Sequence, residues 1–195
     1  MATLVLLACS CDPDPCLDLY ALDQLTAETQ EWFLDESVGN QILTDKNGIS
    51  QTLILGQTYA NSHDNSVEDA CGNTYGSFDF SIHYHTSISP LTFMVDIRGD
   101  AITENGFYLK IDTRNLQTGD HNVATYYFAT RSSQDNNATI TYLDNFQTLA
   151  WEYQDVLQIT FHHSSSVNSV KSVYYAKSYG IIKFSQENGN EFEVM

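Results

Sequence analysis

The C-terminal stretch 170–195, VKSVYYAKSYGIIKFSQENGNEFEVM, decides the fold class. Two runs of β-branched and aromatic residues, 170–176 and 180–184, flank a short link, and a third run, 191–194, follows the turn residues 187–190. Runs of this kind separated by turn residues are typical of an antiparallel meander. Because loose chain ends are usually polar, this apolar rhythm predicts inner strands against which the rest of a sheet is laid.

The clearest single strand is 78–85, in which apolar and polar residues alternate strictly. The apolar residues are Phe78, Phe80, Ile82 and Tyr84, and the polar ones are Asp79, Ser81, His83 and His85. A period of two places successive side chains on opposite faces of a sheet. The pattern therefore predicts that the four apolar residues are buried on one face.

Further strands are predicted at 41–44, 49–55, 91–97, 107–112, 124–130, 139–143, 148–152 and 156–162. Asn47-Gly48 is a strong hairpin signal between the first two, and 60–76 is polar and predicts a surface loop. Residues 19–33 predict one or two short helical turns. No helical run is long enough for a parallel crossover, so we expect at least eight antiparallel strands in a mainly β fold. The sheet would be curved, closed into a partial barrel, or folded as a sandwich.

Composition bounds the class of protein. The 195 residues fit one domain, and 42% hydrophobic residues exclude a disordered chain. The formal net charge is −17, which would repel a polyanion, so no nucleic-acid partner is expected. No apolar run approaches the roughly 18 to 20 residues of a membrane-spanning helix.

The N-terminus carries a localisation signal. Leu6-Leu7-Ala8-Cys9 resembles the lipobox of bacterial lipoproteins, in which the cysteine is acylated after the signal peptide is removed. Acyl chains that contribute about 0.8 kcal/mol per buried methylene can hold a soluble domain on a bilayer. No Lys or Arg precedes Cys9, so a lipoprotein would start upstream of Met1. The alternative is a short buried N-terminal strand.

The predicted organisation follows from this signal. Residues 1–8 would be the remaining apolar part of a signal peptide, 9–18 the lipidated cysteine with a tether, and 19–195 a single antiparallel β domain. Pro13 and Pro15 favour an extended tether. Asp12 is not adjacent to Cys9, so we expect transfer to the outer membrane of a Gram-negative cell, on the periplasmic or the cell-surface side.

Four features, spread over about half of the chain, carry a family resemblance. They are the tether, Trp32-Phe33 ahead of Gly39-Asn40, a hairpin turning at Asn47-Gly48, and the finish Tyr-Tyr-Ala-Lys-Ser-Tyr-Gly-Ile-Ile-Lys at 174–183. Together they resemble small lipoproteins of Bacteroidota. Tyr153-Gln154-Asp155-Val156 matches an element that precedes this finish in that group. Ser178 stands where glycine is usual, so the link between the two strands is expected to turn differently. The resemblance implies a cell-envelope protein and carries over no catalytic residue.

Four cysteines are present, at positions 9, 11, 16 and 71. If Cys9 is acylated, three remain, and exported thiols tend to pair. We expect Cys71 to bond to Cys16 or Cys11, with Cys16 favoured because it is farther from the membrane. The alternative is a local bridge between Cys11 and Cys16.

Histidines offer one candidate metal site. His83 and His85 share one face of a predicted strand, roughly 7 Å apart, and the same parity turns His162 outward. With Asp79 they could form a facial site of imidazole and carboxylate ligands. The spacing matches no strong zinc motif, so a solvent-facing polar cluster is favoured and no cofactor is expected.

Catalytic signals are weak. No Gly-x-Ser-x-Gly motif surrounds the serines of 164–169, and acid pairs for glycoside hydrolysis cannot be picked out among 25 acidic residues. Tyr108, Tyr126 and Tyr127 could stack on glycans, although on strands such residues more often belong to the core. The favoured function is a lipid-anchored envelope protein with a binding or structural role toward a protein or glycan. The alternatives are an anchored or secreted hydrolase and a carrier of an apolar ligand in a half-barrel.

Overall fold

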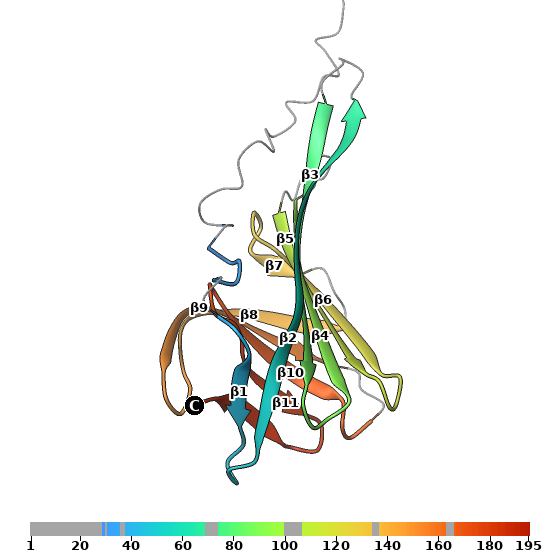
Figure 1. The fold of residues 1–195 in the computed structure, drawn as a ribbon. Helices are drawn as coiled ribbons and strands as arrows, with labels where there is room; N and C mark the ends of the chain where they lie inside the picture. The colour runs from blue at the N-terminus through green and yellow to red at the C-terminus, as the bar shows by residue number, and fades with distance from the viewer. Residues whose placement is uncertain are drawn as a thin grey trace, which may run out of the picture.

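The computed structural model describes residues 29, 31–35, 38–68, 74–99, 107–133, 137–162 and 166–195, with the backbone alone for 57–68 and 74–79. Its strands form a single antiparallel sheet (Figure 1). The strands are β1 (Gln41–Thr44), β2 (Ser50–Glu68), β3 (Thr74–Thr86), β4 (Leu91–Gly99), β5 (Phe107–Asn115), β6 (His121–Tyr127), β7 (Ser132–Ser133), β8 (Ala138–Gln147), β9 (Glu152–Phe161), β10 (Val170–Ala176), β11 (Gly180–Gln186) and β12 (Glu191–Val194).

The strand order is β7-β6-β5-β4-β3-β2-β1-β12-β11-β10-β9-β8, so two meanders are joined where β1 pairs with β12. The two ends of the sheet come close together, because β6 and β7 approach β8. The sheet is therefore nearly closed into a barrel. This confirms the predicted mainly β fold built from one curved antiparallel sheet. The strands predicted at 170–176 and 191–194 begin and end at the predicted residues.

The alternating strand behaves as predicted where its side chains are described. Phe80, Ile82 and Tyr84 are buried, and His83 and His85 are exposed on the outer face. Cross-strand pairing extends each buried residue into a row; the row that begins at Phe80 continues through Ile97, Leu109 and Tyr126. These rows form the inner wall of the barrel. The side chain of Phe78 lies outside the described residues.

Two sequence predictions about loops and strands are wrong. The supposed surface loop 60–76 is largely a continuation of β2 and β3, because backbone pairing persists as far as Glu68 and Thr74. Figure 1 shows this hairpin running well beyond the other strands. The supposed strand 148–152 is instead the turn between β8 and β9, closed by Thr148, whose N–H donates to the Trp151 carbonyl at 2.8 Å.

The interior near one mouth of the barrel is filled by a segment that precedes β1. We call residues 31–35, which include Trp32, the strap. The Trp32 ring is 2% exposed and lies 5.6 Å from the Phe128 ring and 6.3 Å from the Tyr142 and Tyr175 rings. The Tyr175 hydroxyl donates to the Trp32 carbonyl at 2.8 Å. Of the helical turns predicted at 19–33, the described part contains a turn in which the Trp32 N–H donates to the Thr29 carbonyl.

A second apolar cluster lies on the outer face of β9, β10 and β11. Val156, Ala176 and Ile182 are fully buried there, under the distal end of the β8–β9 hairpin. The Phe146 ring of that hairpin stacks on Tyr174 at 4.5 Å. Pairing is interrupted between Leu143↔Val156 and Asn145↔Gln154. The hairpin curls at this interruption, as Figure 1 shows for the β8–β9 end.

Replacing Trp32 with alanine is expected to lower the free energy of unfolding by about 3–5 kcal/mol, because a buried indole leaves a cavity among three other aromatic rings. Urea unfolding followed by circular dichroism measures this. Trp151→Ala is the matched control, since Trp151 is 61% exposed and its loss should change stability by less than about 0.5 kcal/mol. Equal effects of the two substitutions would contradict the role given to the strap.

Candidate functional site: a cleft at the mouth of the barrel

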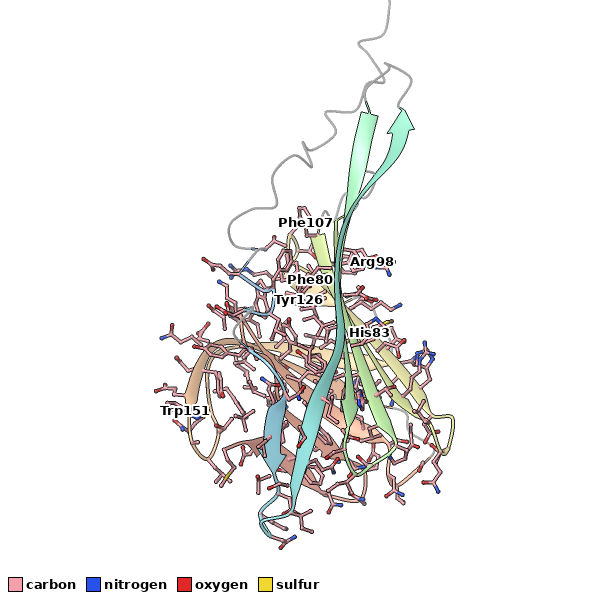
Figure 2. The ribbon with its side chains drawn as sticks, viewed as in Figure 1. Phe80, His83, Arg98, Phe107, Tyr126 and Trp151 are labelled. Carbon is pink, nitrogen blue, oxygen red and sulfur yellow. The ribbon has the colours of Figure 1, made fainter. Side chains whose placement is uncertain are left out.

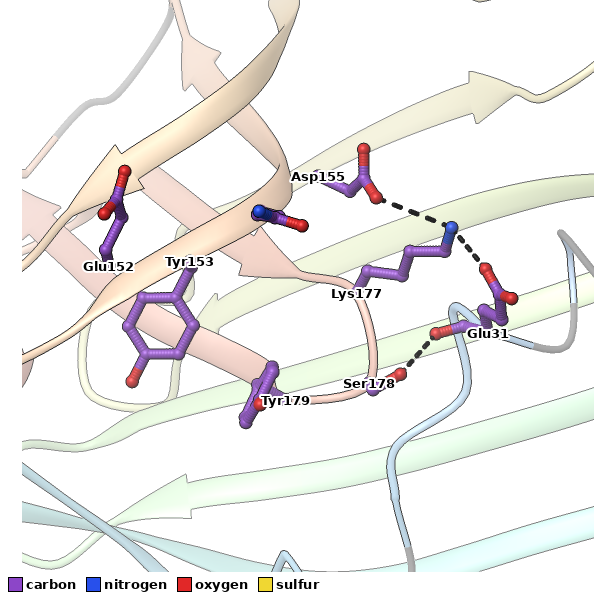
Figure 3. A pocket seen from close by; sticks show the side chains of 8 residues that line it. Glu31, Glu152, Tyr153, Asp155, Lys177, Ser178 and Tyr179 are labelled. Atoms are coloured by element: carbon purple, nitrogen blue, oxygen red, sulfur yellow. Dashed lines mark hydrogen bonds and ion pairs between the residues drawn. The ribbon is translucent and has the colours of Figure 1, made fainter.

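An open cleft of about 550 Å³ lies beside the strap, and we call it the mouth cleft (Figure 3). Three segments that are far apart in the sequence build it: the strap, the start of β9, and the β10–β11 turn. Its lining residues are Glu31, Glu152, Tyr153, Gln154, Asp155, Lys177, Ser178 and Tyr179. The cleft thus combines carboxylates, an amide, an ammonium group and two phenol rings.

The β10–β11 turn joins the strap to the sheet. Ser178 has φ +65°, in the left-handed region that favours glycine. Its hydroxyl donates to the Glu31 carbonyl at 2.8 Å, and its own carbonyl accepts from the Asp35 N–H at 2.9 Å. These two bonds offset the strain of a left-handed serine. They also show why a residue with a hydroxyl side chain suits this turn position.

Gly180 closes the same turn and has φ +80°. A Cβ atom at this position would lie 2.6 Å from the Tyr84 hydroxyl and 2.9 Å from a Leu34 methyl group. Since contacts below 3.0 Å do not occur for real Cβ atoms, glycine is required here for space as well as for backbone conformation. The strap can therefore approach the turn closely.

Lys177 is held between two carboxylates. Its Nζ lies 2.5 Å from Oε2 of Glu31 and 3.5 Å from Oδ2 of Asp155. The hydrogen bond to Glu31, together with the nearby Asp155, raises the pKa of Lys177 above its ordinary value, so the ammonium is charged. Figure 3 shows the three side chains converging from β9, the turn and the strap.

Asp155 is positioned by its backbone and by a tyrosine. It has φ +54°, and its carbonyl accepts the Lys177 N–H at 3.1 Å. The Tyr142 hydroxyl donates to Oδ1 of Asp155. Burial, and then this hydrogen bond, raise the pKa of Tyr142 well above its ordinary value. Tyr142 also packs against Trp32, so it connects the filled interior to Asp155 in the lining of the cleft.

Two tyrosines form the other end of the cleft. The rings of Tyr153 and Tyr179 meet edge to face, with centroids 5.2 Å apart at 80°. Tyr153 is buried, and burial followed by the neighbouring Tyr179 raises its pKa, so it is a neutral phenol. Tyr179 is 52% exposed and is anchored through its carbonyl, which accepts from Nε2 of Gln41 at 2.7 Å.

The predicted histidine site is not assembled as one cluster. His83 and His85 are exposed on β3, and His162 follows β9, which five strands separate from β3 in the sheet order. Nε2 of His162 is hydrogen-bonded instead to the Thr139 hydroxyl at 2.7 Å. The side chain of Asp79 lies outside the described residues. Within the part of the chain that the structure describes, no group of three or more His, Cys, Asp or Glu side chains could hold a metal ion.

The outer face of β4 to β6 carries charged side chains away from the cleft. Arg98 of β4, labelled in Figure 2, lies 3.7 Å from Asp96. Asp112, whose side chain is 4% exposed, accepts two hydrogen bonds of 3.2 Å from Arg114 and one contact of 2.8 Å from Nε2 of His121. Burial opposes ionisation, but these partners prevail and lower the pKa of Asp112. On this face, the buried Asp112 carboxylate is neutralised by its neighbours.

The remaining sequence predictions concern residues that do not line the mouth cleft. Cys9, Cys11, Cys16 and Cys71 all lie outside the described residues, so the acylation and disulfide predictions concern parts of the chain not described. Of the three tyrosines proposed to stack on glycans, Tyr126 is in the core, whereas Tyr108 and Tyr127 form a half-buried pair on the outer face. In the described ranges, no helix is long and apolar enough to span a membrane.

Two sequence motifs supply most of the lining of the cleft: the runs 153–156 and 174–183. Nothing in their spacing indicated that they meet, because the meeting depends on strand order and on the strap. Glu31 gave no signal at all, since its role follows from the position of the neighbouring Trp32.

No protein-family model matches this chain, and no curated protein or solved structure matches it either. The geometry of the barrel and of its mouth cleft is therefore the basis for a functional assignment.

The ion pairs of Asp112 make the free energy of unfolding depend on pH. Because its folded pKa is lowered, Asp112 contributes stability above its ordinary value of 3.8, and the contribution is lost as the pH falls through the folded pKa. Asp112→Asn should lower the free energy of unfolding by about 1–2 kcal/mol near neutral pH, since both partners are partly exposed and screened. Urea unfolding between pH 7 and pH 2.5 should show this difference shrinking in acid.

Asp144→Asn serves as the control for this experiment, because Asp144 is an exposed aspartate on β8. Its substitution should change stability by less than about 0.5 kcal/mol at every pH. A difference between wild type and Asp112→Asn that stays constant down to pH 2.5 would contradict the ionised pairing.

Proposed function

We propose that this protein is a lipid-anchored component of the cell envelope that binds a ligand at its mouth cleft. The barrel-like fold is compatible with a binding or a carrier role. The observation that carries the binding proposal is the convergence of three segments on one open, polar cleft, with side chains already fixed by ion pairs and hydrogen bonds. Groups held in place before binding lose little conformational entropy when a ligand arrives.

The carrier alternative is supported less well. A carrier of an apolar ligand needs a large empty cavity lined by apolar side chains. Near the strap, the space between the walls is occupied by Trp32, and the Phe33 ring stacks on Phe80 at 4.6 Å. Farther inside, the Phe184 ring packs between Phe93 and Phe192 at 5.3 and 5.1 Å. Where the structure describes its side chains, the interior is packed at these rings, which favours binding at the mouth cleft.

The hydrolase alternative also has less support. Glycoside hydrolysis uses two carboxyl groups, one acting as an acid and the other as a base or nucleophile. In the mouth cleft, Glu31 and Asp155 both lie against the Lys177 ammonium, and Asp155 also accepts from Tyr142. This arrangement resembles an ion-pair network that fixes side chains.

Anchoring is supported by the sequence features Leu6-Leu7-Ala8-Cys9 and the Pro-containing tether that follows. In a Gram-negative host, a gene carrying a complete signal peptide should give a protein that incorporates labelled palmitate and sediments with the outer membrane. Cys9→Ala should abolish both, because a thiol is needed for acylation. Equal sedimentation of both proteins without label would refute the lipid anchor.

Binding at the cleft is tested separately with the purified protein. An envelope extract should raise the Tm of the wild-type domain, since a ligand that binds only the folded state stabilises it. Tyr179→Ala should reduce the shift while leaving the Tm in buffer nearly unchanged, because Tyr179 is half exposed. Equal shifts for the two proteins would place any ligand elsewhere.

A further inference from the structure

We infer that the mouth cleft recognises a glycan, and one composed of neutral or amino-bearing sugars in preference to acidic ones. This inference rests on the proposed binding function and specifies its ligand class. It draws on three properties of the cleft: an exposed aromatic ring, a fixed set of hydrogen-bonding groups of both kinds, and a net negative charge.

The aromatic ring is that of Tyr179. Its contact with Tyr153 is edge to face and leaves the side chain 52% exposed at the end of the cleft. In Figure 3 the two rings stand perpendicular to each other beside the polar groups. A partly exposed aromatic surface next to polar groups suits a sugar, which presents C–H bonds on one face and hydroxyl groups around its edge. The backbone bond from Gln41 to the Tyr179 carbonyl helps to hold this residue in place.

The polar groups offer both donors and acceptors within one open cleft. Glu152 is exposed and provides acceptor oxygens, and the amide of the neighbouring Gln154 provides a donor and an acceptor. Lys177 has three N–H bonds, and among the described residues Glu31 and Asp155 are its two ion-pair partners. Sugar hydroxyls both donate and accept, so they can satisfy a mixed set of this kind. An apolar ligand would leave these groups without partners.

The charge of the cleft determines which sugars it would accept. Its three carboxylates, Glu31, Glu152 and Asp155, and its single ammonium, Lys177, leave two negative charges. The whole chain adds to this field with a net charge of −17. A uronic acid or a sulfated sugar would be repelled, whereas a neutral sugar would not be and an amino sugar would be attracted.

Isothermal titration of the wild-type domain with defined oligosaccharides tests the inference. The panel contains neutral oligomers of glucose, mannose and N-acetylglucosamine, an oligomer of glucosamine, and an oligomer of galacturonate. At least one neutral or amino oligomer should bind, and the galacturonate oligomer should bind at least about ten-fold more weakly at low salt. Tighter binding of the galacturonate oligomer, or the absence of binding by every neutral and amino oligomer, would overturn the inference.

Variants separate the cleft from other surfaces. Tyr179→Ala should weaken binding by about ten-fold and Tyr179→Phe by less than about three-fold, because phenylalanine keeps the ring. Tyr127→Ala is the matched control, since Tyr127 is a half-buried tyrosine on the outer face of β6, and it should leave binding unchanged. Equal loss with Tyr127→Ala would overturn the assignment to the cleft.

The envelope extract distinguishes failure of the glycan assignment from failure of the binding function. Periodate, which cleaves vicinal diols, should remove the component that raises the Tm, and proteinase treatment should not. A component that survives periodate and is destroyed by proteinase would overturn the glycan assignment while leaving the cleft as a protein-binding site. An untreated extract that leaves the Tm of the wild-type protein unchanged would contradict the binding function itself.

Discussion

The position of Trp32 inside the barrel mouth is the constraint on which the arrangement of the site depends. The mouth of a nearly closed sheet must be filled, and the Trp32 indole fills it by packing against Tyr142 and Tyr175. The Tyr175 hydroxyl satisfies the Trp32 carbonyl, which would otherwise be an unpaired acceptor in an apolar interior. Once Trp32 is seated, Glu31 has little freedom and meets the β10–β11 turn.

The β10–β11 turn then places polar groups next to the packed strap. Two left-handed residues, Ser178 and Gly180, let the chain reverse tightly under the strap. The Ser178 hydroxyl and the Lys177 ammonium both contact Glu31, and Lys177 reaches across to Asp155 on β9. Exposed ion pairs of this kind add little to stability. Their effect here is to hold side chains from three segments in one geometry.

The sequence predicted the strands well because their signal is local. The alternation from Phe80 to Tyr84 and the apolar runs at 170–176 and 191–194 need no knowledge of their neighbours. The prediction failed for 60–76, because the residues are polar and the strands there are held by backbone pairing. It failed for 148–152 because the Thr148 hydroxyl accepts the Trp151 N–H and closes a turn within a run that looks apolar. The cleft could not be predicted, because its three segments are brought together by the strand order. The left-handed turn at Ser178 could not be predicted either, because it depends on hydrogen bonds to Glu31 and Asp35.

The strand order also has a consequence for how the barrel is assembled. β7 and β8 are consecutive in the chain but form the two ends of the sheet, whereas β1 and β12, at opposite ends of the chain, are neighbours joined by two residue pairs. A break in the backbone between β7 and β8 would leave every strand pair of the sheet order in place. The molecule can thus be regarded as two complementary fragments, β1 to β7 and β8 to β12, held together by a narrow ladder and a shared interior. The contacts between the two fragments are non-local in sequence, and the strap ahead of β1 adds to them, because Trp32 stacks on Tyr175 of β10.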